Sequence, residues 1–329
     1  MKGQDLLKTG ALRHGGIMAN YRCTAACRHC LYACSPARTA GYISSDIAEA
    51  VCSLLKQGGC GSVHIGGGEP FLDIEGLLMT VRKLRHKGIR LEYIETNAYW
   101  AAREDEARNI LKRLQAEGVE ALCISVDPFH AEYVPYAYPL RLHALCNEIG
   151  MGDFLWKPQF IQVLSSLGSL EPHSRAQMER KLSSAYIGET ARAYGIRLGG
   201  RAVNIEQEYA RYRQVEELLD DAPCYGLLST DHFHVDMQGY FIPPGCTGLR
   251  LPLVEAINST APEKYPVFEA LYYRGIRGLL HLAGSYGFRT SQEGYPSKCN
   301  LCFHIRRYLG KYAFQELDSD HYEAALQYY

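Results

Sequence analysis

Short hydrophobic runs alternate with amphipathic stretches between about residue 16 and residue 200. The runs are bounded by glycine or polar residues, which is typical of buried strands. The predicted strands are Ile17–Tyr21, Ser62–Ile65, Arg90–Glu95, Ala121–Val126, Phe154–Gln162 and Ile196–Gly199. The stretches between them repeat apolar residues at helical spacing, and the predicted helices are Ser45–Lys56, Ile74–His86, Asp105–Glu117, Leu140–Ile149 and Glu179–Tyr194.

Residues at the expected helix ends support this division. Ser45 and Asp73 stand where an N-cap is expected, and a glycine follows each helix, at positions 58, 88, 118, 150 and 195. Strands that alternate with helices predict a parallel sheet with right-handed crossovers. About six such units are too few for a closed eight-stranded barrel, so we expect an α/β fold, a partial (β/α)6 barrel. Its site should lie at the carboxyl ends of the strands.

The pattern changes after about residue 220. The run HVDMQGYFI predicts a hairpin that turns at Gln238–Gly239, followed by a helix over Val267–Ala283 and a last helix that begins near Leu301. We therefore expect an N-terminal segment (1–16), a barrel (17–220) and a small cysteine-rich α+β extension (221–329).

Composition narrows the class of protein. The chain has 329 residues and a formal net charge of −1, which argues against a nucleic-acid binder and a polybasic membrane protein. No apolar run reaches the roughly 18 residues of a membrane span, and no signal peptide is visible at the start. We expect a cytoplasmic protein, in which the 12 cysteines indicate metal or catalytic sites rather than disulfides.

Three cysteines follow the first predicted strand, as Cys23-x3-Cys27-x2-Cys30. A 4Fe–4S cluster held by three thiolates keeps one iron open for another ligand. Two other interpretations remain: a zinc site with Cys34 as fourth ligand, or three unconnected core cysteines.

A glycine-rich turn follows the second predicted strand, with the sequence Gly66-Gly67-Gly68-Glu69-Pro70. Glycines let a backbone approach a ligand closely, and a carboxylate can receive an ammonium group. Taken alone, the run is also compatible with a tight strand-to-helix turn. The two motifs, in this order and one βα unit apart, resemble the radical S-adenosylmethionine (radical SAM) superfamily.

The resemblance implies an enzyme that binds SAM at an open iron and cleaves it reductively to a 5′-deoxyadenosyl radical, which takes a hydrogen atom from substrate. A flavodoxin or ferredoxin would serve as reductant. The residues that match the family's SAM-binding positions are His29, Gly67, Gly68, Glu69, Pro70, Thr96, Asn97, Ser125, Asp127 and Arg201.

Four further cysteines lie in the last third of the chain: Cys224, Cys246, Cys299 and Cys302. This arrangement resembles the twitch or SPASM extensions of radical SAM enzymes and implies an auxiliary 4Fe–4S cluster, so two clusters are expected in all. Structural zinc is the alternative.

Across nearly the whole chain the motifs resemble radical SAM peptide epimerases of the epipeptide type. The resemblance implies a peptide substrate, modified by epimerisation or crosslinking. Those enzymes have two adjacent cysteines after the hairpin, whereas this chain has Gly245-Cys246. Cys34 is the candidate thiol donor in their place, and His130 is a candidate acid or base. Two alternatives are an enzyme acting on a small molecule and a zinc-stabilised binding protein without catalysis.

Overall fold

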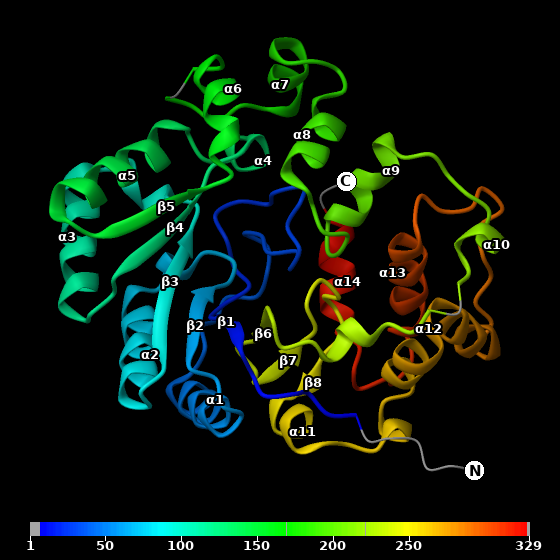
Figure 1. The fold of residues 1–329 in the computed structure, drawn as a ribbon. Coiled ribbons are helices and arrows are strands. Elements are labelled where there is room, and N and C mark those ends of the chain that lie inside the picture. The colour runs from blue at the N-terminus through cyan, green and yellow to red at the C-terminus, as the bar shows by residue number, and fades with distance from the viewer. Residues whose placement is uncertain (1–6, 169, 221, 328–329) are drawn as a thin grey trace.

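An open eight-stranded sheet runs through the centre of the structure (Figure 1). The computed structural model describes residues 7–168, 170–220 and 222–327. The strand order is β5-β4-β3-β2-β1-β6-β7-β8. The strands are β1 (His14–Met18), β2 (Ser62–Gly66), β3 (Arg90–Thr96), β4 (Ala121–Ser125), β5 (Gly152–Trp156), β6 (Phe233–Val235), β7 (Tyr240–Ile242) and β8 (Leu251–Pro252).

Strands β1 to β6 are parallel and form the expected partial barrel. β1 lies between β2 and β6, whereas β7 and β8 continue the sheet antiparallel. The prediction of a strand over Ile196–Gly199 was wrong, because β6 takes the place beside β1. A side chain at Gly200, where φ is +51°, would collide with the backbone at Leu31, so this segment follows the cysteine loop instead of pairing with a strand.

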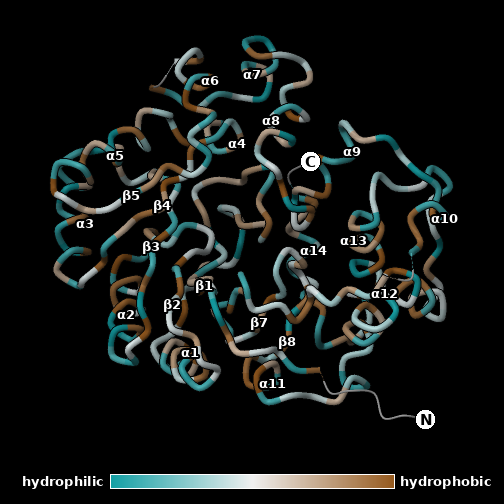
Figure 2. Tube along the Cα trace, viewed as in Figure 1, coloured by the Kyte–Doolittle hydropathy of each residue, from teal (hydrophilic) through white to brown (hydrophobic). Residues whose placement is uncertain are grey.

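Helices cover the outer side of the parallel strands, and α5 packs on β4 and β5 (Figure 1). Figure 2 shows both hydrophobic and hydrophilic residues along α1 to α3, as amphipathic helices require. The helices of the barrel part are α1 (Ser45–Gln57), α2 (Ile74–His86), α3 (Glu104–Ala116), α4 (Pro128–Ala131), α5 (Ala137–Ile149), α6 (Ile161–Ser165), α7 (Arg175–Lys181), α8 (Tyr186–Tyr194), α9 (Ala202–Tyr209) and α10 (Val215–Leu218).

Local signals explain most of the helix ends. Asp73 caps α2 by accepting a hydrogen bond from the Gly76 amide at 2.9 Å, as predicted. The cap of α1 is Ser44 and not Ser45, since the Ser44 side chain accepts from the amide of Ile47. The predicted helix over Glu179–Tyr194 is two helices, because Ser183 Oγ accepts from the Ala185 amide and this local bond competes with the helix.

The C-terminal part begins with the predicted hairpin of β6 and β7. Asp236 Oδ1 accepts from the amides of Gln238 and Tyr240, each at 2.9 Å, and closes the turn. The predicted division at residue 220 stays a prediction, and residues 1–6 and 221 lie outside the described residues. The helices that follow are α11 (Leu253–Asn258), α12 (Pro266–Ser285), α13 (Lys298–Leu309) and α14 (Ser319–Leu326).

Five short 3-10 helices complete the described elements: η1 (Pro70–Leu72), η2 (Tyr99–Ala102), η3 (Pro158–Phe160), η4 (Tyr225–Leu228) and η5 (Pro262–Lys264). In the described part of the chain, no helix has the combined length and apolar character that crossing a membrane requires.

Candidate functional site

A long loop after β1 carries four cysteines at the carboxyl end of the sheet. Cys23, Cys27 and Cys34 are buried, and Cys30 is half-buried. Backbone amides point at two of the sulfurs: Ala25 N lies 3.4 Å from Cys23 Sγ, and Cys34 N lies 3.3 Å from Cys30 Sγ. Such donors favour thiolates, the form that binds metal.

The four thiols also influence one another. A hydrogen bond from the Cys34 thiol lowers the pKa of Cys30 to about 5, whereas burial raises the pKa of Cys34 well above its usual value. Burial likewise raises the pKa of Cys23, and the charges of Cys27 and Cys30 add to this. The loop therefore concentrates sulfur ligands of two kinds: Cys30 ionises readily, whereas Cys23 and Cys34 need a nearby cation to ionise.

Arg201 holds the cysteine loop by hydrogen bonds. The side chain is completely buried, and it donates from Nε to the Cys27 carbonyl at 2.9 Å and from Nη2 to the Cys34 carbonyl at 2.6 Å. Its own amide donates to the Cys30 carbonyl at 3.1 Å. The guanidinium thus positions the cysteine loop, and the expected contact with a SAM carboxylate stays a prediction.

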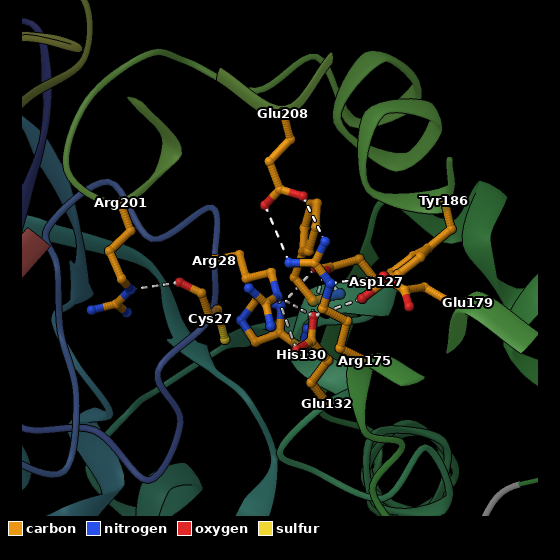
Figure 3. A network of polar contacts seen from close by, with 11 residues as sticks. Cys27, Arg28, Asp127, His130, Glu132, Arg175, Glu179, Tyr186, Arg201 and Glu208 are labelled. Atoms are coloured by element: carbon orange, nitrogen blue, oxygen red, sulfur yellow. Dashed lines mark hydrogen bonds and ion pairs between the residues drawn. The ribbon is translucent and has the colours of Figure 1, made fainter. Parts of the chain in front are cut away.

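A second clamp fixes the same loop on its other side. Arg28 Nε lies 3.1 Å from both carboxylate oxygens of Glu132, and the Tyr186 hydroxyl donates to Glu132 at 3.3 Å. Figure 3 shows Arg28 beside Cys27, with Arg201 on the opposite side of Cys27. The loop is therefore held by the residue that follows α4, by α8 and by the residue that precedes α9.

The glycine-rich turn after β2 packs directly against the cysteine loop. A Cβ at Gly68 would collide with the carbonyl oxygen of Arg22, so only glycine allows this approach. Asn20 locks the two segments together, because its Nδ2 donates to the Glu69 carbonyl at 2.9 Å and its Oδ1 accepts from the Gly68 amide at 3.0 Å. The close backbone approach predicted for these glycines is thus made to another part of the protein.

Glu69 is completely buried at the carboxyl edge of β2 and β3. Its carboxylate accepts hydrogen bonds from Thr96 Oγ1 at 2.9 Å, the Asn97 amide at 2.8 Å and the Phe71 amide at 3.2 Å. Burial raises its pKa to about 7, although these donors act in the opposite direction. A buried carboxylate that meets only neutral donors is suited to a cationic ligand group.

Asp127 and two histidines form a polar cluster after β4. His130 Nδ1 lies 2.6 Å from Asp127 Oδ2, and His29 Nε2 lies 3.9 Å from the same oxygen. Although burial acts to raise the pKa of Asp127, the two imidazoles hold it below its usual range. Burial acts to lower the pKa of His130, but the Asp127 carboxylate raises it well above its usual value. Asp127 and His130 therefore favour an ion pair.

The His29 ring lies among aromatic side chains. It stacks on Phe129 with ring centres 4.9 Å apart and meets Tyr194 edge-on at 4.7 Å. Burial lowers its pKa to about 4, so the ring is neutral near pH 7. Its Nδ1 is buried and has no hydrogen-bond partner in the described part of the chain, which leaves one polar atom for a bound group.

A narrow recess joins the ends of β3 and β4 beside the cysteine loop. Its walls include Asn97, Ser125, Asp127, His130, Tyr136 and Leu164. Asn97 links the recess to the cysteines, because its Nδ2 lies 3.0 Å from Thr24 Oγ1 and 3.5 Å from Cys23 Sγ. Thr24 and Asn20 were missed in the sequence, since nothing local marks a residue whose partner is 73 or 49 positions away.

The C-terminal cysteines come together beside α13. Cys299 and Cys302 lie on that helix, Cys224 precedes η4, and Cys246 follows β7. Burial raises the pKa of Cys246 to about 12, and the other three cysteines act in the same direction, so their charges are within electrostatic reach. Arg306, which is buried, is hydrogen-bonded to Cys302 and lowers the pKa of Cys246.

Comparisons with known proteins find one matching family and one curated relative, and the family match covers the stretch that carries the first two motifs. The family described as "4Fe-4S single cluster domain" matches residues 17–129. YydG of Bacillus subtilis (strain 168), whose name connects it with peptide biosynthesis, is 32% identical over 120 residues. That match covers 36% of this chain and 37% of YydG, so the chain spans about a third of the length of this curated relative. The predicted resemblance to radical SAM proteins with a 4Fe–4S domain is confirmed.

Solved structures resemble the chain more distantly. The Streptococcus suis SuiB structure bound to precursor peptide SuiA has 15% identity and a TM-score of 0.36, and it covers 96% of this chain and 76% of that chain. The native anSMEcpe structure with bound AdoMet and Kp18Cys peptide has 12% identity and a TM-score of 0.44, and it covers 90% and 97%.

Proposed function

We propose that this protein is a radical SAM enzyme that takes a hydrogen atom from a peptide substrate. The observation that carries the proposal is the packing of the cysteine loop against the Glu69 turn. A loop of sulfur ligands and a buried carboxylate for an ammonium group meet at one point, through Asn20 and Arg22. A zinc-stabilised binding protein would have no use for that carboxylate.

The three cysteines of the motif fit the ligand set of the cluster. Cys23, Cys27 and Cys30 would hold it, and the amides near Cys23 and Cys30 would stabilise the ligating thiolates. When bound, the cluster and SAM supply reductive cleavage of the sulfonium and a 5′-deoxyadenosyl radical. The reducing electron would come from a flavodoxin or ferredoxin.

The residues around the recess would hold SAM. Glu69 would receive the ammonium group of SAM. Gly67, Gly68 and Pro70 shape the turn that carries Glu69, and Thr96 and Asn97 orient the Glu69 carboxylate. Ser125 and Asp127 would face the ribose and the carboxylate group of SAM. His29 would lie beside the adenine, because its ring already stacks on Phe129 and its Nδ1 has no partner among the described residues.

The C-terminal cysteines would hold an auxiliary 4Fe–4S cluster. Arg306 supports this assignment, because a buried guanidinium beside four thiolates offsets part of their negative charge. Bound zinc is the competing assignment for Cys224, Cys246, Cys299 and Cys302.

A peptide is the proposed substrate because the matched relative's name connects it with peptide biosynthesis. Epimerisation and crosslinking are the outcomes that this chemistry allows. In an epimerisation, the substrate radical would take a hydrogen atom from a thiol, and an external reductant would restore that thiol. Cys34, buried in the cysteine loop, is the candidate donor, and His130 is a candidate acid or base at the recess.

The test uses anaerobically reconstituted protein with dithionite and SAM. We expect about eight irons and eight sulfides per chain and formation of 5′-deoxyadenosine. Cys27→Ala should abolish both the SAM-site iron and the cleavage, whereas Cys52→Ala, a buried cysteine on α1, should retain both. Zinc without iron in the wild type would overturn the assignment.

The substrate is tested separately. Peptides deuterated at their α-carbons are incubated with the active enzyme, and 5′-deoxyadenosine is analysed by mass spectrometry. Deuterium in this product supports hydrogen abstraction from a peptide. Cleavage of SAM that never transfers deuterium from any peptide, but does so from a labelled small molecule, would favour the alternative substrate class.

A further inference from the structure

Three histidines outside the cysteine sites gather on one face of the sheet. His64 belongs to β2, His234 belongs to β6, and His232 lies just before β6. A ring nitrogen of each lies within 4.8 Å of the corresponding nitrogens of the other two. The His64 and His234 rings meet edge-on, with 3.0 Å between His64 Nε2 and His234 Nε2.

A glycine on the strand between them makes this meeting possible. Gly16 of β1 pairs in register with both His64 and His234. A Cβ at Gly16 would collide with the rings of both histidines. Since neighbouring strands place in-register side chains on the same face, the two rings extend over the glycine from either side.

Packing holds the three rings in place. His64 is 1% exposed and His234 is 7% exposed, whereas His232 is exposed. Tyr93 stacks on His64 with ring centres 5.0 Å apart, and Tyr32 lies 5.2 Å from His234. The His64 ring is also hydrogen-bonded to the backbone of Gly15. A hydrogen bond at the remaining nitrogen is how proteins orient imidazole ligands of metals.

We propose that His64, His232 and His234 form a binding site for Zn²⁺, separate from the cysteine sites. Zinc–nitrogen bonds of about 2.0 to 2.1 Å in tetrahedral geometry place two nitrogens about 3.3 Å apart. The observed 3.0 Å between the Nε2 atoms of His64 and His234 needs only a small opening to reach that value. The His232 ring stacks on His64 with ring centres 5.3 Å apart, so this exposed side chain would turn to direct a nitrogen at the same ion. Imidazole is a preferred ligand of zinc and of similar divalent ions.

A carboxylate lies beside the trio and completes the donor set. Glu95 Oε1 is 3.7 Å from His64 Nε2, and 43% of the Glu95 side-chain surface is exposed. The fourth position would therefore be taken by Glu95 or by water held by it. The exposed edge of His232 gives the ion a path from solvent. None of these residues belongs to either cysteine set, so this site stands independently of the proposed function.

The test uses full-length protein whose clusters have been filled with iron and sulfide, so that the cysteines are occupied. The protein is dialysed against buffered ZnCl2, and zinc per chain is measured by mass spectrometry. X-ray absorption at the zinc edge then identifies the ligands, since nitrogen lies at about 2.0 Å and sulfur at about 2.3 Å. We expect one zinc per chain with nitrogen and oxygen neighbours only.

His232→Ala is the informative variant, because this ring is exposed and its loss leaves the core intact. We expect its zinc affinity to fall by more than about tenfold, since even outer partners of metal ligands have effects of that size. His281→Ala, an exposed histidine on α12, is the matched control and should bind zinc as the wild type does.

Three results would overturn the site: sulfur neighbours around the zinc, undiminished zinc binding by His232→Ala, or no zinc bound by the cluster-filled protein. The last result would leave His64 and His234 as a hydrogen-bonded pair. An unchanged melting temperature of His232→Ala shows that any loss of zinc does not come from unfolding.

Discussion

Arg201 donates from Nη2 to the carbonyl oxygen of Cys34 at 2.6 Å, across 167 positions of sequence. This bond, together with the one from Nε to Cys27, makes the shape of the cysteine loop dependent on a residue in the last half of the chain. The loop is therefore a tertiary structure, and the spacing of its cysteines alone does not define it.

Replacing Arg201 should loosen that loop. Arg201→Ala removes two charged hydrogen bonds from a completely buried place, so we expect a loss of about 3 kcal/mol in the free energy of unfolding. Urea denaturation of the metal-free protein measures the loss, and the iron content after reconstitution should fall as well. Arg211→Ala, an exposed arginine, is the control. Equal stability of the two variants would contradict the clamp.

Gly68→Ala should separate the Glu69 turn from the cysteine loop. The added methyl group collides with the Arg22 carbonyl oxygen, and backbone atoms cannot rotate away. A displacement of this kind near reacting groups costs about 100-fold in rate, which is our expectation for 5′-deoxyadenosine formation. Gly61→Ala, whose added methyl group would meet no atom within 4 Å, should keep the wild-type rate. A rate in Gly68→Ala within twofold of wild type would argue against this packing.

Glu69 should make the metal-free, SAM-free protein less stable as pH rises. Its folded-state pKa is about 7 against a usual value of 4.5, so the folded protein holds this proton more tightly than the unfolded chain. The stabilisation is present below about pH 4.5 and is lost as pH rises through 7, by about 3 kcal/mol. Glu69→Gln cannot ionise, and its unfolding free energy should lack this decline. If the unfolding free energies of the two proteins changed with pH in the same way, the raised pKa of Glu69 would be refuted.

Cys34→Ala should keep the SAM-site cluster and the cleavage of SAM but lose an epimerised product. Its thiol lies next to Cys30, and the motif supplies three ligands without it. Iron content, 5′-deoxyadenosine and product chirality are measured side by side. Loss of iron comparable to that of Cys27→Ala would instead identify Cys34 as a fourth ligand.

Cys299→Ala should remove the auxiliary metal alone. This cysteine is exposed on α13, so its replacement leaves the barrel packing unchanged. We expect about four irons per chain to remain, with SAM still cleaved. Cys60→Ala, a buried cysteine away from both cysteine sets, should keep about eight. Loss of one zinc in place of four irons would establish the structural-zinc alternative.

Elements with complete local signals were predictable from the sequence, and elements that depend on distant partners were not. The α2 helix matches its prediction because its N-cap, Asp73, directly precedes it and its apolar spacing is local. The strand expected at Ile196–Gly199 had suitable residues, but β6 pairs with β1 in its place. Likewise, a motif position suggested a SAM contact for Arg201, whereas its carbonyl partners depend on the folded loop.

The proposed histidine site depends on one local feature of the sequence and on one distant partner. His232 and His234 are two residues apart, so they share one face of an extended segment, and this spacing was visible in the sequence. The participation of His64 was not visible, because it depends on β1 lying between β2 and β6 with Gly16 in register.

The pairing of β1 with β6 determines when during synthesis the proposed iron site can be completed. Ile17 is opposite Val235, and the Thr247 hydroxyl donates to the Leu31 carbonyl at 2.7 Å. A nascent chain that has emerged from the ribosome only as far as Arg201 has neither contact, and one side of β1 is then an open edge. The cysteine loop should therefore reach its final arrangement only after Val235 and Thr247 have emerged, although its cysteines lie near the start of the chain.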